Sequence, residues 1–594
     1  MDLSGFGTTK TFEENSAFFL ERRSSFIWDM PPFSSQFSFF LTKKGEVSAK
    51  KTGVKKNIFI HSKEDIAEEM NHWKSTLPLE KVEILYIYGI GLGYPFFALK
   101  DWVEKSSKHR LVFLEDSPEF FGLFLQTTLL QEVLSHPQVD FLYMPTKKQE
   151  ENLSLLMAKN FPRTFIEIVS APHYKKKKKR LEELRKEVFR KMTVVSSIYA
   201  EVYAYPFLFR NFLASMKRLS SASMMEASWK GAFSNVPAII CGAGPSLNAS
   251  IPFLENIGNK ALILAGGSAI TALSSKGILP HLGVAVDPTE EEVDRFVKAN
   301  AWEVPLCYLS RLQERVFMSG NHPLIFMKSF LEGAISLWLQ NLELPGEWIG
   351  EKLHEESLSV TLITLAVADY LGCNPIIFCG VDLAYSDGKR YAEGVTETNV
   401  PLQREEVIAD RLLVEKGQKE QKVVTAVRWV MESFAISDYV KKTKEKIFLN
   451  VSEEGLGFKN VPYTSWEDVS FKYFDKELDL HSFVHCLIEK TKTPDKEVKR
   501  IDEKIREWKS SFIRCKEFLH VLVDEKENPK RIVAKIELEE EEAFRNFLSM
   551  IYGGLAKFFS YLHGDERQHT EEEKWKILLH ETNKFIEIFA DFGY

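Results

Sequence analysis

The sequence has few cysteines, and no two of them form a CxxC pair. Structural zinc sites and disulfide scaffolds use closely spaced cysteines, so this spacing argues against both. Most of these residues lie in apolar, strand-like surroundings, which is typical of reduced core thiols in a cytoplasmic protein. We therefore expect no metal site at the six positions, which are Cys241, Cys307, Cys373, Cys379, Cys486 and Cys515.

An excess of positive charge is also absent, because 77 Lys and Arg face 84 Asp and Glu for a net charge of −7. This excludes a global field for nucleic acid or anionic lipid, so any anion site must be local. The first five residues lack the basic and then apolar pattern of a signal peptide. The least charged stretch, 357–381, contains Asp369, Gly372 and Pro375. It predicts a buried helix followed by a strand, and no membrane span.

What is present is the composition of a globular chain, 44% hydrophobic and 27% charged. This excludes a disordered or collagen-like protein. The 594 residues exceed the ~250–300 at which a single core stops growing, so several domains are expected. The pattern of apolar and charged residues changes along the chain. It predicts an α/β domain over 1–225, a nucleotide-binding domain over 226–470 and a helical domain over 471–594. The predicted fold class is α/β, with Rossmann-like N-terminal and central domains, a parallel central sheet and an α-helical C-terminal domain.

The N-terminal segment carries a glycine turn. A strand over 82–88 ends in Gly89, Gly91 and Gly93, and a second strand over 110–114 ends at Glu115 and Asp116. This order occurs in nucleotide-binding domains, where an acid takes the ribose hydroxyls. Glycines also serve strand-to-helix packing, so a structural turn in an accessory domain remains the alternative.

Charged stretches elsewhere predict helices. The basic run 175–180 leads into a charged helix, and a solvated helix start is the alternative to a contact for an acidic or nucleic-acid partner. Ile501, Ile505, Trp508 and Phe512 have helical spacing within 498–522. A second amphipathic helix is expected over 537–562, and both are expected to pack within the chain.

The middle segment contains a glycine turn directly after a strand over 236–241. Gly242 and Gly244 let the chain turn sharply, and Pro245 suits the first position of a helix. The free N–H groups that follow, with the Ser246 hydroxyl, would then hold a phosphate. Leu247 stands where a dinucleotide fingerprint has its third glycine, so the pattern predicts a mononucleotide type of turn.

Three more strand ends repeat this design. A strand over 261–265 leads through Gly266, Gly267 and Ser268 into a helix over 269–276, followed by Gly277 at the position of a C-cap. A strand over 282–286 ends at Asp287. A buried helix is expected to begin after Ser357 or Ser359 and to run to 371, followed by a strand over 375–379 that ends at Asp382.

The ends of parallel strands meet at one edge of the sheet, where open α/β folds bind ligands. An aspartate at a strand end often only caps the next helix. The coincidence of Asp287 and Asp382 with two glycine turns favours a ligand site, while the capping alternative stays open.

These motifs, in this order, resemble the motility accessory factor (Maf) family. The resemblance covers roughly residues 55–470. Its segments are 60–63, 88–93, 241–247, 264–268, 277–281, 286–288, 359–360, 371–372, 380–389 and 450–458.

The resemblance implies a cytoplasmic glycosyltransferase that moves a nonulosonic acid, such as pseudaminic or sialic acid, from a CMP donor to Ser or Thr of flagellin. The central domain is also similar to bacterial sialyltransferases and to MptE-like 6-hydroxymethylpterin pyrophosphokinases, which transfer pyrophosphate from ATP. Fold kinship does not choose between these reactions. No bound cofactor is expected with a CMP donor, whereas ATP would require Mg²⁺. The partners expected are the nucleotide sugar and a protein acceptor, with no nucleic acid.

The resemblance also implies roles for the strand-end residues. Gly242, Gly244, Pro245, Ser246 and Leu247 would hold the donor phosphate. Gly266, Gly267 and Ser268 would leave room for ribose and base, and Asp287 would take a ribose hydroxyl or the cytosine amine. Asp382 would orient the donor sugar or the acceptor.

Tyr391 stands where relatives are expected to have a histidine, within the motif at Asp387. A histidine could act as general base, whereas a tyrosine with a pKa of ~10 needs a large shift to do so. The base is therefore unassigned, with His281 and His354 as substitutes, although a lone histidine is more often structural. A catalytically inactive nucleotide-binding scaffold is the remaining alternative.

Overall fold

The computed structural model describes residues 3–22, 30–33, 35–52, 58–160, 163, 165–299, 301, 303–318, 320–353, 359–386, 388–395, 412–524, 529–555 and 571–594. Two compact units make up this part of the chain. The first is built from residues up to 200, and the second from residues 201–553 and 571–594. The boundary predicted at 225 therefore lies inside the second unit.

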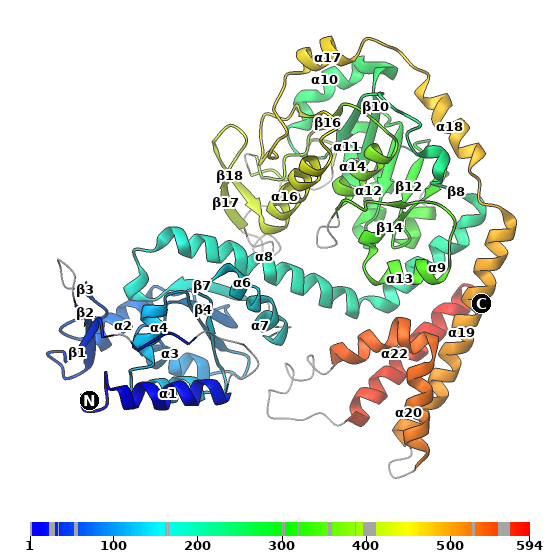
Figure 1. Cartoon of the computed structure of the whole chain (residues 1–594). Helices are drawn as coiled ribbons and strands as arrows, with labels where there is room; N and C mark the ends of the chain where they lie inside the picture. Colours follow the sequence, from blue (N-terminus) through cyan, green and yellow to red (C-terminus); the bar gives the residue numbers. More distant parts are fainter. Residues whose placement is uncertain are drawn as a thin grey trace. The chain divides into compact units, whose positions relative to one another are not determined.

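The first unit contains a parallel sheet with strand order β6-β5-β4-β7. Strands β4 and β7 of this sheet are labelled in Figure 1. The chain starts this sheet at β4, moves outward through β5 and β6, and returns to the other side of β4 as β7. This is the order of a Rossmann half, as the sequence predicts. The four strands are β4 (Ile84–Tyr88), β5 (Arg110–Glu115), β6 (Val139–Tyr143) and β7 (Ile166–Ser170).

Helices and a small antiparallel sheet complete the first unit. The sheet consists of β1 (Phe37–Leu41), β2 (Val47–Lys51) and β3 (Ile58–Phe59). The helices are α1 (Thr9–Arg22), α2 (Ile66–Ser75), α3 (Tyr94–Glu104), α4 (Pro118–Phe124), α5 (Leu130–Ser135), α6 (Lys147–Glu150), α7 (Asn152–Asn160) and α8 (Lys178–Tyr203). The basic run 175–180 thus leads into α8, and its Arg180 pairs with Asp116 and Glu150.

The second unit is organised around a sheet of eight parallel strands in the order β19-β16-β9-β10-β11-β12-β13-β8. This confirms the predicted α/β class with a parallel central sheet. The strands are β8 (Ser223–Met224), β9 (Ala238–Cys241), β10 (Leu262–Gly266), β11 (Leu282–Ala285), β12 (Leu306–Tyr308), β13 (Leu324–Phe326), β16 (Ile376–Cys379) and β19 (Phe448–Asn450).

Short apolar runs form these strands because both faces of the sheet are covered, as in other parallel sheets. Ile240, Leu264 and Val284 on adjacent strands share one buried cluster with α14 (Val360–Tyr370). As predicted, α14 is buried and Ser359 caps it, because the Ser359 hydroxyl accepts a hydrogen bond from the N–H of Leu362. The predicted alternative start at Ser357 lies outside the described residues.

The strand order changes direction at β9. After β9 the chain adds β10, β11, β12 and β13 on one side, and it returns with β16 and β19 on the other. The turns that follow β9 and β16 therefore lie next to each other at the carboxyl edge of the sheet, where the strand order changes direction. A crevice at this edge is where open α/β sheets bind ligands.

Other elements surround this sheet. The helices are α9 (Tyr205–Arg218), α10 (Leu247–Ile257), α11 (Gly267–Ser274), α12 (Glu290–Ala299), α13 (Ala334–Asn341), α16 (Val427–Lys442), α17 (Trp466–Tyr473) and α18 (Leu480–Lys490). The small strand pairs are β14 (Lys328–Ser329) with β15 (Trp348–Ile349), and β17 (Leu412–Lys416) with β18 (Lys422–Ala426).

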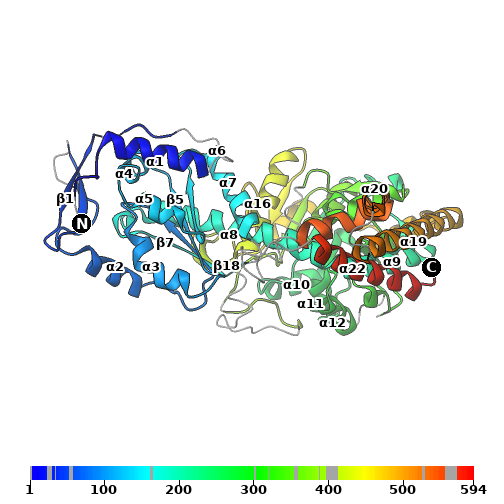
Figure 2. The same cartoon turned by 90° about the horizontal axis from the view of Figure 1, so that it is seen from below.

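The C-terminal segment is helical, as predicted, and belongs to the same unit as the central sheet. Helix α19 (Asp495–Asp524) buries the predicted face of Ile501, Ile505, Trp508 and Phe512, and it lies beside α22 (Glu571–Asp591) in both views (Figures 1 and 2). Phe209 of α9 packs against Phe512. This shared aromatic core explains why the segment does not separate from the central part.

The single helix predicted over 537–562 is wrong. Helix α20 (Lys530–Glu540) ends before Glu541, whose backbone is extended, and a π-helical turn (Phe544–Leu548) follows. Glu541 accepts hydrogen bonds from Ser511 and Arg514 of α19, so side-chain pairing holds the chain away from helical geometry at this point. Residues 556–562 of the predicted helix lie outside the described part.

The six cysteines are free, and all except the exposed Cys486 are buried as core thiols. Exposure of Cys486 differs from the prediction because α18 turns this position outward. Within the described ranges, no helix combines the length and apolar character that crossing a bilayer requires.

Candidate functional site

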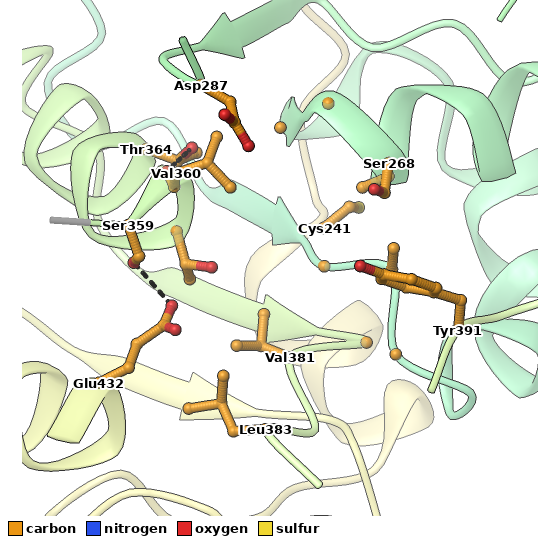
Figure 3. Close-up of a pocket in the computed structure, with 18 of the residues that line it drawn as sticks. Cys241, Ser268, Asp287, Ser359, Val360, Thr364, Val381, Leu383, Tyr391 and Glu432 are labelled. Atoms are coloured by element: carbon orange, nitrogen blue, oxygen red, sulfur yellow. Dashed lines mark hydrogen bonds between the residues drawn. The ribbon is translucent and has the colours of Figure 1, made fainter. Parts of the chain in front are cut away.

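A cavity of about 460 Å³ lies at the carboxyl edge of the central sheet (Figure 3). It is bordered by the residues that follow β9, β10, β11 and β16, which are the four strand ends singled out in the sequence. Most of the predicted site residues line it, namely Gly242, Gly244, Gly266, Gly267, Ser268, Asp287, Asp382 and Tyr391. Pro245, Ser246 and Leu247 are not part of the lining.

The turn after β9 differs from the predicted phosphate cradle because its N–H groups already have acceptors. The N–H of Ser246 donates to Oδ2 of Asp382 at 2.9 Å, and the Ser246 hydroxyl donates to Oδ1 of the same carboxylate. The N–H of Leu247 donates to the carbonyl of Gly244. The prediction of free, outward N–H groups here is wrong, since the Asp382 carboxylate occupies the place of an anion.

Pro245 is also not the first residue of a helix. α10 begins two residues later, at Leu247, and Ser246 is its N-cap residue. The intervening turn is fixed by the bonds from Ser246 to Asp382, so Ser246 joins the ends of two strands.

The two glycines of this turn make room for protein atoms. A Cβ on Gly244 would lie 2.6 Å from Cγ of Asp382, and one on Gly242 would lie 2.5 Å from the carbonyl oxygen of Gly380. The N–H of Gly244 donates to that carbonyl at 2.8 Å. The β9 and β16 turns are therefore in direct contact, and glycine is required for this approach.

The glycines after β10 also accommodate neighbouring side chains. A Cβ on Gly266 would meet Val360 at 2.4 Å, and one on Gly267 would meet Glu292 at 2.9 Å. The expected room for ribose and base is thus filled directly above these two residues, while both still border the cavity.

Ser268 has a different position from the one predicted, because α11 begins at Gly267 and not at residue 269. Ser268 therefore lies in the first turn of this helix, and it borders the cavity. The N-cap residue Gly266 makes no side-chain capping bond. Since the first N–H groups of a helix lack partners within the helix, this turn offers donors to an anion. Gly277 follows the helix with a φ of 76°, as a C-cap glycine should.

Asp382 is almost fully buried. Burial raises the pKa of this carboxyl to about 6, although the hydrogen bonds from Ser246 oppose the shift. Asp382 is therefore a buried carboxylate that changes its charge near neutral pH and holds two turns together.

Asp287 caps the turn before α12 and also borders the cavity. Its Oδ1 accepts hydrogen bonds from the N–H and the hydroxyl of Thr289, directly before α12, and its Oδ2 lies 3.4 Å from Arg295. The side chain also projects into the cavity (Figure 3). The capping function thus does not remove Asp287 from the site.

Several charged and aromatic lining residues were not found from the sequence. They lie in the first two turns of helices or on loops, and are Glu292, Arg295, Arg311, Arg390, Arg428, Trp429 and Glu432. The one usable signal was the density of charge from 289 to 295, directly after a predicted strand end.

Two of these missed residues are carboxyls with raised pKa values. Burial raises the pKa of Glu292 to about 7, against the lowering effect of Arg295, which donates to it at 2.8 Å. Burial also raises the pKa of Glu432, which accepts a hydrogen bond from Ser359 at 2.7 Å (Figure 3). Partial neutralisation of such carboxyls leaves the arginines dominant in the local field.

Helix ends add to this field. The cavity is bordered by the first turns of α11, α14 and α16. Ser359 caps α14, whereas the N-cap residue of α16, Ala426, makes no side-chain bond. Uncapped helix N-termini attract negative charge. The cavity therefore favours an anionic ligand even though the whole chain is acidic.

Tyr391 lies on a loop that crosses the turn after β9, where the N–H of Ala392 donates to the carbonyl of Ala243 at 2.8 Å. The Tyr391 hydroxyl points into the cavity (Figure 3). His281 does not reach the cavity, because its Nδ1 accepts from the N–H of Ile263 and its Nε2 lies 3.1 Å from Asn259. His281 is thus structural, and burial lowers its pKa to about 3. His354 and Asp387 lie outside the described residues.

The glycine turn of the first unit is filled by side chains. A Cβ on Gly89 would meet Tyr174 at 2.6 Å, and one on Gly91 would meet His173 at 2.9 Å. Glu115 at the end of β5 is buried and accepts from the N–H of Ile90 and from the Tyr174 hydroxyl. These contacts favour the structural alternative for this turn over the ligand site.

Among the residues that the structure describes, no group of three or more His, Cys, Asp or Glu side chains is placed to hold a metal ion. Mg²⁺ bound with a nucleotide needs only one or two protein carboxylates, since phosphate oxygens and water supply the other ligands. In the described part of the chain, four carboxylates border the cavity, namely Asp287, Glu292, Asp382 and Glu432, and both oxygens of Asp382 already accept hydrogen bonds from Ser246.

The solved structure of a MAf glycosyltransferase from Magnetospirillum magneticum AMB-1 is 14% identical, over 98% of this chain and 97% of that chain, with a TM-score of 0.47. No curated protein matches the sequence. The family model described as 6-hydroxymethylpterin diphosphokinase MptE-like matches residues 210–388. This match confirms the MptE-like resemblance predicted for the central segment, and residues 210–388 form an MptE-like domain.

Proposed function

We propose that the chain is a glycosyltransferase that moves a nonulosonic acid, of the sialic or pseudaminic type, from a CMP donor to Ser or Thr of a protein such as flagellin. The observation that carries the proposal is the cavity at the sheet edge, with its arginines and uncapped helix N-termini. A nucleotide sugar of this class carries both a phosphate and a carboxylate, which suits such a field.

In this proposal the nucleotide phosphate binds at the first turn of α11. Ser268 supplies a hydroxyl there, and the N–H groups of the turn supply further donors. The Asp287 carboxylate projects into the same cavity and is available to a ribose hydroxyl or to the cytosine amine. The β9 turn then acts indirectly, by holding Asp382 in place.

Transfer would occur by attack of the acceptor oxygen on the anomeric carbon of the sugar. The bond from that carbon to the phosphate oxygen breaks, and CMP leaves with the electron pair. The acceptor proton must go to a base, and Asp382 and Glu292 are carboxyls with pKa values of about 6 and 7 at the cavity. General bases work best with a pKa near the working pH. Tyr391 is proposed to donate a hydrogen bond to the leaving phosphate.

Calorimetry with CMP and ATP, each with and without Mg²⁺, tests the proposal. Binding of CMP without metal supports it, and donor hydrolysis should fall strongly in Asp382→Asn. Glu393→Gln is a matched control, because Glu393 is exposed and its side chain pairs outward with Lys276. Failure of CMP to bind at millimolar concentration would contradict the proposal.

A second function, transfer of pyrophosphate from ATP to 6-hydroxymethylpterin, is favoured by the family model that matches residues 210–388. It predicts binding of ATP that depends on Mg²⁺, and weak binding of CMP. A catalytically inactive scaffold would bind a nucleotide and show no turnover with any nucleotide sugar. The same titrations, followed by a turnover assay, separate the three.

A further inference from the structure

One arginine at the cavity lacks the acidic partner that the others have. Arg295 donates to Glu292, Arg311 lies 3.4 Å from Glu201, and the charge of Arg428 acts on Glu432. No described acid forms an ion pair with Arg390 over the ranges given above. The Arg390 Nε is buried and has no hydrogen-bond partner.

The structure holds Arg390 in a defined place. Its loop is fastened by the bond from Ala392 to the β9 turn, and by a bond from the N–H of Glu393 to Asn248 at 3.1 Å. The guanidinium carbon lies 5.0 Å from the ring centre of Tyr391 and 5.8 Å from that of Trp429. Two aromatic rings and two backbone bonds thus restrict this side chain.

Such an arrangement is unfavourable without a ligand. A buried donor without an acceptor loses its hydration and gains no hydrogen bond in return. Contacts with aromatic rings make up for the lost hydration of a cation only in part. Because Arg390 borders the cavity, an anion bound there would supply the missing acceptor.

The geometry of the group favours a carboxylate. A guanidinium binds a planar carboxylate through two parallel N–H bonds, which a lysine cannot do. The nucleotide phosphate already has a proposed place at the first turn of α11, on a different element from the Arg390 loop. The second anion of an acidic sugar nucleotide is the carboxylate on the anomeric carbon of the sugar.

We propose that Arg390 binds the sugar carboxylate of the donor and so selects acidic sugars over neutral ones. This inference rests on the proposed function and names the residue that recognises the sugar of the donor. Trp429 acts as a positioning residue, since it packs on Arg390 and on Tyr385, with a centroid distance of 4.9 Å to the latter.

Calorimetry on the full chain compares CMP with CMP-N-acetylneuraminic acid. The wild type is expected to bind the sugar nucleotide at least about tenfold more tightly, since a charge-assisted bidentate pair contributes this much or more. In Arg390→Gln this advantage is lost while the affinity for CMP stays the same. In Lys389→Gln, which removes one exposed positive charge from the same loop, both affinities stay the same.

Other outcomes overturn the inference in distinguishable ways. An equal loss of affinity for both ligands in Arg390→Gln means that Arg390 contacts the nucleotide and not the sugar. An unchanged advantage means that Arg390 contacts neither. If the wild type binds neither ligand, the proposed function itself fails. Melting curves show whether Arg390→Gln folds, and if it does not, Arg390→Lys is measured, which should keep affinity for CMP and lose most of the advantage.

Discussion

Replacement of Gly244 by alanine perturbs the contact that joins the two strand ends of the site. The new Cβ would lie 2.6 Å from Cγ and Oδ2 of Asp382 and 2.7 Å from the carbonyl oxygen of Gly380. Ordinary contact begins at 3.4 Å, so the neighbours must retreat by about 0.8 Å, the difference between the two distances. The backbone of Gly244 is not in the left-handed region, so alanine adds no backbone strain there. The steric contact of the new Cβ is therefore the source of the destabilisation.

The magnitude follows from the bonds that such a movement breaks. The bond from the N–H of Ser246 to Asp382 is 2.9 Å long, and a shift of this size carries it beyond hydrogen-bond range. Two hydrogen bonds to a buried carboxylate are then lost, at about 1.5–3 kcal/mol for each bond to a charged group. Partial relaxation reduces the total, and we expect a destabilisation of about 3 kcal/mol.

Urea unfolding followed by circular dichroism and by tryptophan fluorescence measures this effect on the second unit. Gly553→Ala is a matched control, because Gly553 is helical and exposed and its new Cβ would meet nothing within 4 Å. The control should be neutral or more stable by up to about 1 kcal/mol. If Gly244→Ala lies within about 0.5 kcal/mol of the wild type, the proposed contact between the turns is refuted.

Three further predictions concern other parts of the molecule. The folded state holds the Asp382 proton up to a pKa of about 6, above the usual value, so its contribution to stability is greatest at low pH and is lost as pH rises through 6. In Asp382→Asn, the free energy of unfolding from urea titrations should therefore fall less between pH 4.5 and pH 7.5 than in the wild type, by about 2 kcal/mol, and an equal fall in both proteins would contradict this. Ser359→Ala removes the cap of α14 and the bond to Glu432, which should cost about 1–2 kcal/mol in the same assay, whereas an unchanged midpoint would argue against the cap. Gly91→Ala, at a φ of 56° with His173 2.9 Å from the new Cβ, should increase hydrogen exchange in residues 84–115 and leave nucleotide affinity unchanged. Loss of nucleotide affinity in that variant would show that the first turn is part of a ligand site.

The fold could be predicted from the sequence because short apolar runs alternate with helical patterns. The strands predicted over 236–241, 261–265 and 375–379 match β9, β10 and β16 to within a few residues. Ser359 and Gly277 marked the start and the end of helices by local chemistry that needs no tertiary information. The helix predicted over 537–562 was wrong because Glu541 bonds to another helix, a contact between distant segments that no local pattern reveals.

The candidate site could be predicted only in part. Glycines and aspartates at strand ends identified the correct edge of the sheet, because parallel strands bring these ends together. The function of each glycine could not be foreseen, since the space above Gly244 and Gly267 is filled by Asp382 and Glu292. These contacts depend on how two loops meet in the folded chain. A glycine allows a ligand or a side chain to approach the backbone equally well, so the glycine pattern in the sequence does not tell which of the two lies there.

The arginines show a second limit. Arg390 lies on a loop, and Arg428 lies in the first turn of a helix, 38 residues later in the chain. Only the folding of α16 and the loop against the sheet edge brings both to one cavity. Side chains without a motif of their own are therefore found by structure alone.

The most direct test of the central claim is a crystal structure of the full chain with CMP. We predict density for the nucleotide in the cavity between Ser268 and Asp287, with its phosphate at the first turn of α11. Density at the Gly89–Gly93 turn of the first unit, or an empty cavity in crystals grown at saturating CMP, would contradict the claim.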